Sequence, residues 1–107
     1  MDDLDASIVY LCGELDASST SAFLTQTHEV VSRHRDVIMD VHLLEYADST
    51  GVAAILSIKN ALREAGKKLY LAGCHGLLKK ILYTIGADRE LVCFEDVDHA
   101  AQAIRNR

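Results

Sequence analysis

Short apolar stretches alternate with helical patterns four times along the chain, and no other feature of the sequence constrains the fold as strongly. The apolar stretches lie at residues 7–12, 37–41, 69–72 and 91–94. They are brief, rich in β-branched and aromatic residues, and do not alternate with polar residues, which is typical of strands covered on both faces. We therefore expect these four segments to be strands of one sheet.

The stretches between these strands carry apolar residues at helical spacing. The expected helices cover residues 17–34, 49–65, 77–85 and 96–104. Gly66 and Gly86 follow two of them, as glycine commonly follows a helix end, and Asp96 can cap the last. The apolar face of the second helix, which we expect to be buried, carries Val52, Ile55, Leu56 and Leu62.

Strand–helix alternation of this kind predicts an α/β fold. We expect a mostly parallel four- to five-stranded sheet covered by about four helices. The chain contains no proline, no repeat and no low-complexity stretch, so nothing in it reads as a linker. We therefore expect a single domain over residues 1–107.

The charge balance and the apolar runs exclude several classes of protein. The chain has 11 Lys and Arg against 16 Asp and Glu, a net charge of −5, so we expect no nucleic-acid partner. Its apolar runs reach about five residues, far short of the roughly 18 needed for a membrane span. The acidic start at residues 1–5 does not resemble a secretion signal. We expect a cytoplasmic protein with no membrane span.

The cysteines and histidines show no pattern of a metal or redox site. Cys12, Cys74 and Cys93 have no C-x-x-C spacing, and the five histidines lack metal-ligand spacing. We interpret the cysteines as buried, reduced side chains, because structural disulfides are rare in the cytosol. A redox pair between Cys74 and another thiol stays open. We expect no cofactor, no metal and no catalytic residue, and hence no enzyme.

Residues 45–51, which read Glu-Tyr-Ala-Asp-Ser-Thr-Gly, stand between a strand and a helix. Asp48 or Ser49 would cap that helix. Gly51 in the first turn costs stability relative to alanine, so it suggests that a close backbone approach or a partner matters there. A phosphate on a hydroxyl at a helix start would be well tolerated. The residues alone leave two readings open, a simple cap on a buried helix and a regulated hydroxyl.

Over about residues 8–104 the chain resembles STAS domains, and specifically the stand-alone anti-sigma-factor antagonists of bacteria. The resemblance rests on the segment 13–16, Gly-Glu-Leu-Asp, and on the segment 46–52, Tyr-Ala-Asp-Ser-Thr-Gly-Val. It implies that the unphosphorylated protein binds an anti-sigma factor serine kinase and so releases the sigma factor. It also implies that phosphorylation on Ser49, with Thr50 as second choice, switches binding off. A serine phosphatase acting on phospho-Ser49 would restore it.

Carried over by position, the resemblance also assigns a partner-binding surface. Its residues are Asp16, Tyr46, Asp48, Ser49, Thr50, Gly51 and Val52. Members of this family usually carry one more strand before the first one seen here. We expect that edge strand to be short or missing, and the exposed edge would allow a weak homodimer. The alternative function is that of a STAS subunit of a lipid-transport ABC system, which docks on its ATPase.

Overall fold

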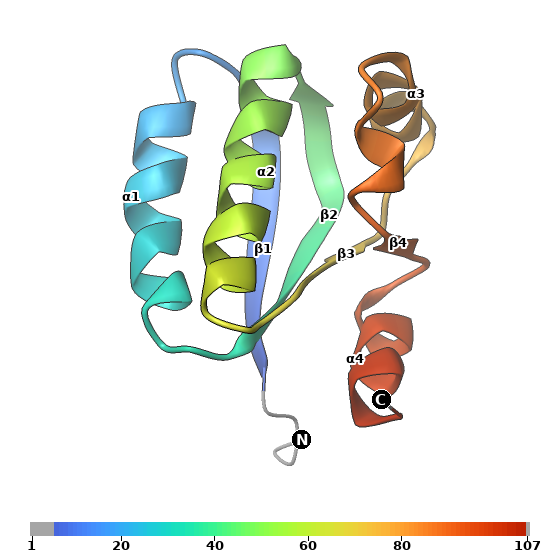
Figure 1. The fold of residues 1–107 in the computed structure, drawn as a ribbon. Coiled ribbons are helices and arrows are strands. Elements are labelled where there is room, and N and C mark those ends of the chain that lie inside the picture. Colours follow the sequence, from blue (N-terminus) through green and yellow to red (C-terminus); the bar gives the residue numbers. More distant parts are fainter. Residues whose placement is uncertain (1–5, 107) are drawn as a thin grey trace.

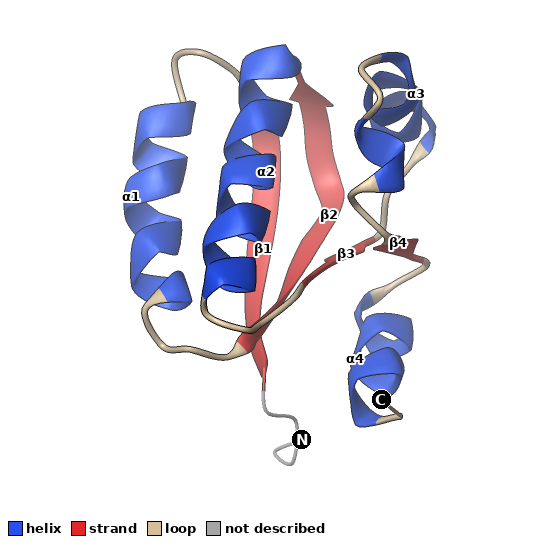
Figure 2. Ribbon diagram, in the orientation of Figure 1, coloured by secondary structure: helices blue, strands red, loops and turns tan. Residues whose placement is uncertain are grey.

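Four parallel strands in the order β1-β2-β3-β4 form the central sheet (Figures 1 and 2). The structure is a computed structural model that describes residues 6–106. Its elements are β1 (Ala6–Leu15), α1 (Thr20–Val31), β2 (Asp36–Ala47), α2 (Ser49–Glu64), β3 (Leu69–Ala72), α3 (Gly76–Thr84), the short 3-10 helix η1 (Ala87–Arg89), β4 (Cys93–Phe94) and α4 (Val97–Arg105). The predicted α/β fold, with four strands and four α-helices, is confirmed.

The helices cover the two faces of the sheet unequally. Helices α1, α2 and α3 pack on one face and form the main core, which includes Phe23, Ile55 and Leu78. Helix α4 packs on the other face against Ile38 and Ala72. In Figure 1, α1 and α2 stand side by side over β1 and β2. The core therefore lies mainly between the sheet and the first three α-helices.

The expectation that every strand is covered on both faces is wrong for β1. Its side chains alternate between the core and solvent. Ile8 and Tyr10 on the outer side are 38% and 64% exposed, and Cys12 is exposed as well. Alternation of this kind is typical of a strand with one open face. The sequence does not show this alternation, because most residues on both faces of β1 are apolar.

Strands β1 and β2 are both longer than the predicted segments at 7–12 and 37–41. Their pairing continues through two register shifts until Leu15 lies opposite Ala47. The backbone ladder therefore includes polar residues that an apolar pattern cannot assign to a strand. Strand β3 has the predicted bounds, whereas β4 is limited to Cys93–Phe94. Helix α1 is shorter than the predicted 17–34, because a turn precedes Thr20.

The helix ends largely follow the predicted signals. Gly66 and Gly86 have φ values of 76° and 78° directly after α2 and α3, a conformation that glycine adopts at little cost. Asp96 caps α4, its carboxylate accepting from the amide of His99 at 2.9 Å. Val52, Ile55 and Leu62 are fully buried on α2; Leu56 is only partly buried.

Cys74 and Cys93 form a disulfide, so the prediction of three buried, reduced cysteines is wrong. Their α-carbons lie 6.1 Å apart, within the usual span of a disulfide. Cys93 belongs to β4 and Cys74 follows the adjacent strand β3. The pairing of these two strands brings the thiols together, and the cysteine spacing alone does not reveal that neighbourhood. Cys12 is free and exposed.

The question of an additional edge strand falls on residues 1–5, which lie outside the described part of the chain, as does the acidic start. Within residues 6–106, β1 is an edge strand that pairs with β2. Across the same residues, no helix is long and apolar enough to cross a membrane.

Candidate functional site

The two segments that carry the sequence signal meet at one end of the sheet. Leu15 at the end of β1 lies opposite Ala47 at the end of β2. The amide of Asp48 donates to the carbonyl of Leu15 at 3.2 Å. Parallel strands end at the same edge, so Asp16 and Asp48 each follow one of two neighbouring strands. In Figure 1 this edge is at the top, where α2 begins.

Gly51 fits this edge because it has no side chain. It is buried, and a Cβ at its position would lie 2.9 Å from the carbonyl carbon and 3.1 Å from Cγ of Leu15, with overlap of the carbonyl oxygen. The predicted close backbone approach at Gly51 is confirmed. It holds the first turn of α2 directly against the end of β1.

Asp48 is the cap of α2, which decides between the two predicted candidates. Its Oδ1 accepts from the amide of Gly51 at 2.9 Å, and its carbonyl accepts from the amide of Val52 at the same distance. Ser49 and Thr50 are therefore the first two residues of the helix. Both are exposed, so their hydroxyls are open to approach from solvent.

Asp16 is held in a tight turn by two serines. Its Oδ1 accepts from the hydroxyl of Ser18 at 2.7 Å and from the amide of Ser18 at 3.0 Å. The amide of Asp16 donates to the hydroxyl of Ser19 at 2.9 Å. Donation by the Ser18 hydroxyl, with its amide next, lowers the pKa of Asp16 below its ordinary value. The edge therefore carries a carboxylate that stays ionised at neutral pH.

Exposed side chains of β2 continue this surface. Tyr46 is 44% exposed and lies opposite Glu14 of β1. Leu43, which is 56% exposed and lies opposite Cys12, is not among the residues predicted for this surface. A register shift precedes the pairing of Cys12 with Leu43, and an apolar side chain in a strand gives no sign of which face it takes after such a shift.

Two residues of the predicted partner-binding set lie below this surface. Gly51 is buried and Val52 has no exposed area. They position the turn, whereas Asp16, Asp48, Ser49 and Thr50 have side chains that solvent reaches. The structure thus brings the predicted positions to one edge, where five of them are at least partly exposed and two are buried beneath them.

His42, His75 and His99 take part in local hydrogen bonds. His42 lies 2.8 Å from the carboxylate of Asp40, and His99 lies 2.6 Å from that of Asp96. This contact raises the pKa of His99 and lowers that of Asp96. In the part of the chain that the structure describes, no group of three or more His, Cys, Asp or Glu side chains could hold a metal ion.

Comparison with known proteins gives one family and one fold. The family model described as STAS domain matches residues 2–100. No curated protein sequence matches the chain.

Several solved structures are similar over nearly the whole chain. An anti-sigma factor antagonist from Mycobacterium paratuberculosis has a TM-score of 0.86 at 19% identity, covering 98% of this chain and 90% of its own. A sulfate transporter family protein from Wolinella succinogenes has 0.84 at 19% identity, covering 100% and 93%. The Bacillus protein SpoIIAA has 0.80 at 17% identity in its unphosphorylated form, covering 100% and 93%, and 0.71 at 18% in its phosphorylated form, covering 100% and 96%. At these identities the likeness is one of fold.

Proposed function

This chain belongs to the STAS domain family, and from that premise we propose that it is an anti-sigma-factor antagonist. It acts by binding a protein partner and catalyses no reaction. Unphosphorylated, it binds an anti-sigma factor serine kinase and so releases the sigma factor. Phosphorylation on Ser49 switches this binding off, and a serine phosphatase acting on phospho-Ser49 restores it. The observation that carries the proposal is the exposed Ser49 at the first position of α2.

The position of Ser49 suits a phosphate that leaves the fold intact. The free amides of a first helical turn and the helix dipole both favour negative charge there. The turn itself is held from below by Gly51 against Leu15 and by the Asp48 cap. The modification would therefore change the surface and leave the backbone in place.

The same position suits a phosphate that disrupts binding. A phosphoserine brings about −2 charge, next to the Asp48 carboxylate and at the edge where ionised Asp16 lies. A partner that covers this edge must desolvate that charge and meet the repulsion. A loss of about 1.4 kcal/mol already lowers affinity tenfold, so an electrostatic switch needs no conformational change. The likeness to SpoIIAA, which is known in both forms, supports this reading.

The proposal is tested by incubating the protein with ATP and each serine kinase encoded near its gene. Peptide mass spectrometry should find one phosphate, on Ser49. Ser49→Ala should abolish labelling and still bind the kinase, because it removes a hydroxyl outside the Asp48 cap, and Ser49→Asp should weaken binding. Phosphate on Thr50, or full labelling of Ser49→Ala, would contradict the assignment of Ser49.

A second candidate function is docking to a transport protein. The TM-score to the sulfate transporter family protein, 0.84, is close to the 0.86 to an anti-sigma factor antagonist, at the same 19% identity. In this reading the chain is a STAS subunit of a lipid-transport ABC system that docks on its ATPase, and Ser49 is not a switch. Pull-down from native lysate separates the two, since it recovers either a serine kinase or an ATPase with its permease.

Two minor points belong to the same proposal. We place the protein in the cytoplasm, where a kinase with its ATP is available and where we expect the Cys74–Cys93 pair to be reduced. We also propose that any homodimer is weak and forms through the edge of β1, whose outer side exposes Ile8 and Tyr10. Sedimentation at increasing protein concentration tests the second point.

A further inference from the structure

A cleft of about 530 Å³ opens along the outer edge of β3, between the end of α2 and the segment that leads into β4. It exists because β4 is short, so that β3 pairs with it only through Leu71 and Ala72. Leu69 and Tyr70 then line the open space. The volume lies in the range of small-molecule sites. The cleft is at the amino ends of the strands, whereas Ser49 follows their carboxyl ends.

One wall of the cleft is apolar. The rings of Tyr70 and Phe94 contact each other with centroids 5.9 Å apart and planes tilted by 44°. Val92, which also lines the cleft, is 61% exposed. This wall can bury the hydrocarbon or aromatic part of a ligand, which would be stabilised by removal of apolar surface from water.

Four basic residues and one acidic residue, Glu90, also line the cleft, in a chain with a net charge of −5. The four basic residues come from α2 and the turn after it: Lys59, Arg63, Lys67 and Lys68. Lys59 lies 4.0 Å from the carboxylate of Glu90. Lys67 and Lys68 lie beyond the last turn of α2, so stabilisation of the helix dipole does not account for them.

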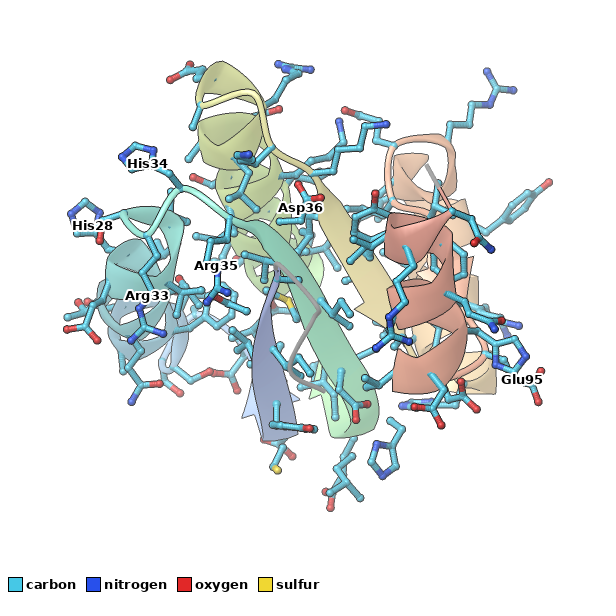
Figure 3. The ribbon with its side chains drawn as sticks, turned by 90° about the horizontal axis from the view of Figure 1, so that it is seen from below. His28, Arg33, His34, Arg35, Asp36 and Glu95 are labelled. Carbon is cyan, nitrogen blue, oxygen red and sulfur yellow. A yellow bond between two sulfur atoms is a disulfide. The ribbon has the colours of Figure 1, made fainter. Side chains whose placement is uncertain are left out.

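The turn after α1 lies beside the turn that carries Lys68. The amide of Lys68 donates to Asp36 at 2.9 Å, and the amide of Val37 donates to the carbonyl of Lys68 at 3.0 Å. Figure 3, a view of this end from below, shows Arg33 and Arg35 on the side of α1, with Asp36 toward the centre. Arg33 lies 3.6 Å from Glu29, so the positive charge open to a ligand is that of the basic residues in the cleft, where it raises the local concentration of anions.

We propose that this cleft binds an amphiphilic organic anion. Its carboxylate or phosphate faces Lys67, Lys68 and Arg63, and its apolar part lies against Tyr70, Val92 and Phe94. Cations alone would hold any small anion weakly in water, and the apolar wall alone would not distinguish charge. The two together select molecules that carry both features. The inference does not depend on the role of Ser49.

The test is an NMR titration of the isotope-labelled full chain with octanoate and with octyl phosphate. Amide shifts should saturate with either ligand and should be largest at residues 66–70 and 90–94. The ligand with the higher affinity identifies the preferred head group. Acetate, inorganic phosphate and octyltrimethylammonium at the same concentrations should give no saturating shift there. Equal binding of the cationic amphiphile, or saturation elsewhere on the protein, would overturn the proposal.

Charge-reversal variants sharpen the test. Lys67→Glu with Lys68→Glu should weaken binding by at least about tenfold, a change of about 1.4 kcal/mol. Lys79→Glu with Lys80→Glu, on exposed positions of α3 outside the cleft, changes the net charge equally and should leave affinity unchanged. Equal affinity in the two double variants would overturn the proposal. So would binding to phosphatidylglycerol vesicles without binding of dissolved octanoate or octyl phosphate, which would indicate a membrane surface.

Discussion

The α-carbon of Gly51 lies so close to the carbonyl group of Leu15 that a β-carbon would stand 2.9 Å from the carbonyl carbon. This contact joins the end of β1 to the start of α2. It also explains why the segments 13–16 and 46–52 form one structural unit although they are far apart in the sequence.

Gly51→Ala should destabilise the protein by about 1–3 kcal/mol, because the added methyl group meets backbone that cannot move freely. The gain in helix propensity from alanine, about 1 kcal/mol, offsets only part of the cost. Urea unfolding measures the change. Gly76→Ala is the matched control, since it lies at the start of α3 with no atom within 4 Å of an added Cβ. Equal stability of the two variants would contradict the packing described for Gly51.

Ser18→Ala should raise the pKa of Asp16 toward its ordinary value, because the Ser18 hydroxyl is the main cause of its lowering. A carboxylate with a lowered pKa stabilises the folded protein above the pKa of the unfolded chain, near 3.8. That contribution is lost as the pH falls through the pKa of the folded state. The variant should thus be less stable than wild type at neutral pH and equal to it in strong acid.

Carboxyl-detected NMR titration measures the Asp16 pKa directly, and Ser21→Ala, on an exposed position of α1, is the control. An Asp16 pKa that stays low in Ser18→Ala would show that the Ser18 amide and the Ser19 hydroxyl and amide suffice to lower it.

Reduction of the Cys74–Cys93 disulfide should lower the free energy of unfolding. The two cysteines are 19 residues apart, and closing a loop of about that length contributes about 3 kcal/mol in the chain-entropy model. Thermal unfolding with and without dithiothreitol measures the loss. Cys93→Ser should be insensitive to the reductant, whereas Cys12→Ser should respond as wild type does. If the melting temperature of the wild type is the same with and without dithiothreitol, this result would argue against the disulfide.

If the proposed function holds, Tyr46→Ala should weaken kinase binding by more than about tenfold and leave the fold intact, because interface energy concentrates in aromatic side chains at the centre of a contact. Tyr46 is 44% exposed, so its removal leaves no closed cavity. Tyr83→Ala on α3, where the side chain is 76% exposed, is the control and should bind normally. If Tyr46→Ala binds with full affinity, Tyr46 is a half-buried residue of β2 and not part of the interface.

The fold class and the start of α2 could be predicted from the sequence because both depend on local signals. Asp48 and Gly51 mark the beginning of the helix through hydrogen bonding and backbone contact, and β3 is a short apolar run. The true lengths of β1 and β2 depend on pairing between distant segments. Register shifts in that pairing draw polar residues into the strands, and Leu43 is exposed after one of them.

The disulfide and the cleft escaped prediction for a related reason. Cys74 and Cys93 meet only because β3 and β4 are neighbours in the sheet. The cleft arises because pairing between β3 and β4 begins only at Leu71 and Cys93, which leaves the beginning of β3 open. Lys67 and Lys68 read as ordinary surface charge until the sheet edge beside them is known.

The anchoring of the first turn of α2 has a kinetic consequence. Because the Asp48 cap and the Gly51–Leu15 contact hold that turn, we expect no slow rearrangement of the domain after a group is added to Ser49. On the proposed function, the lag between modification and loss of the partner is then the residence time of the complex itself. The rate at which the partner dissociates would then set the speed of the response. Substitutions at the interface could change that rate without changing the stability of this domain.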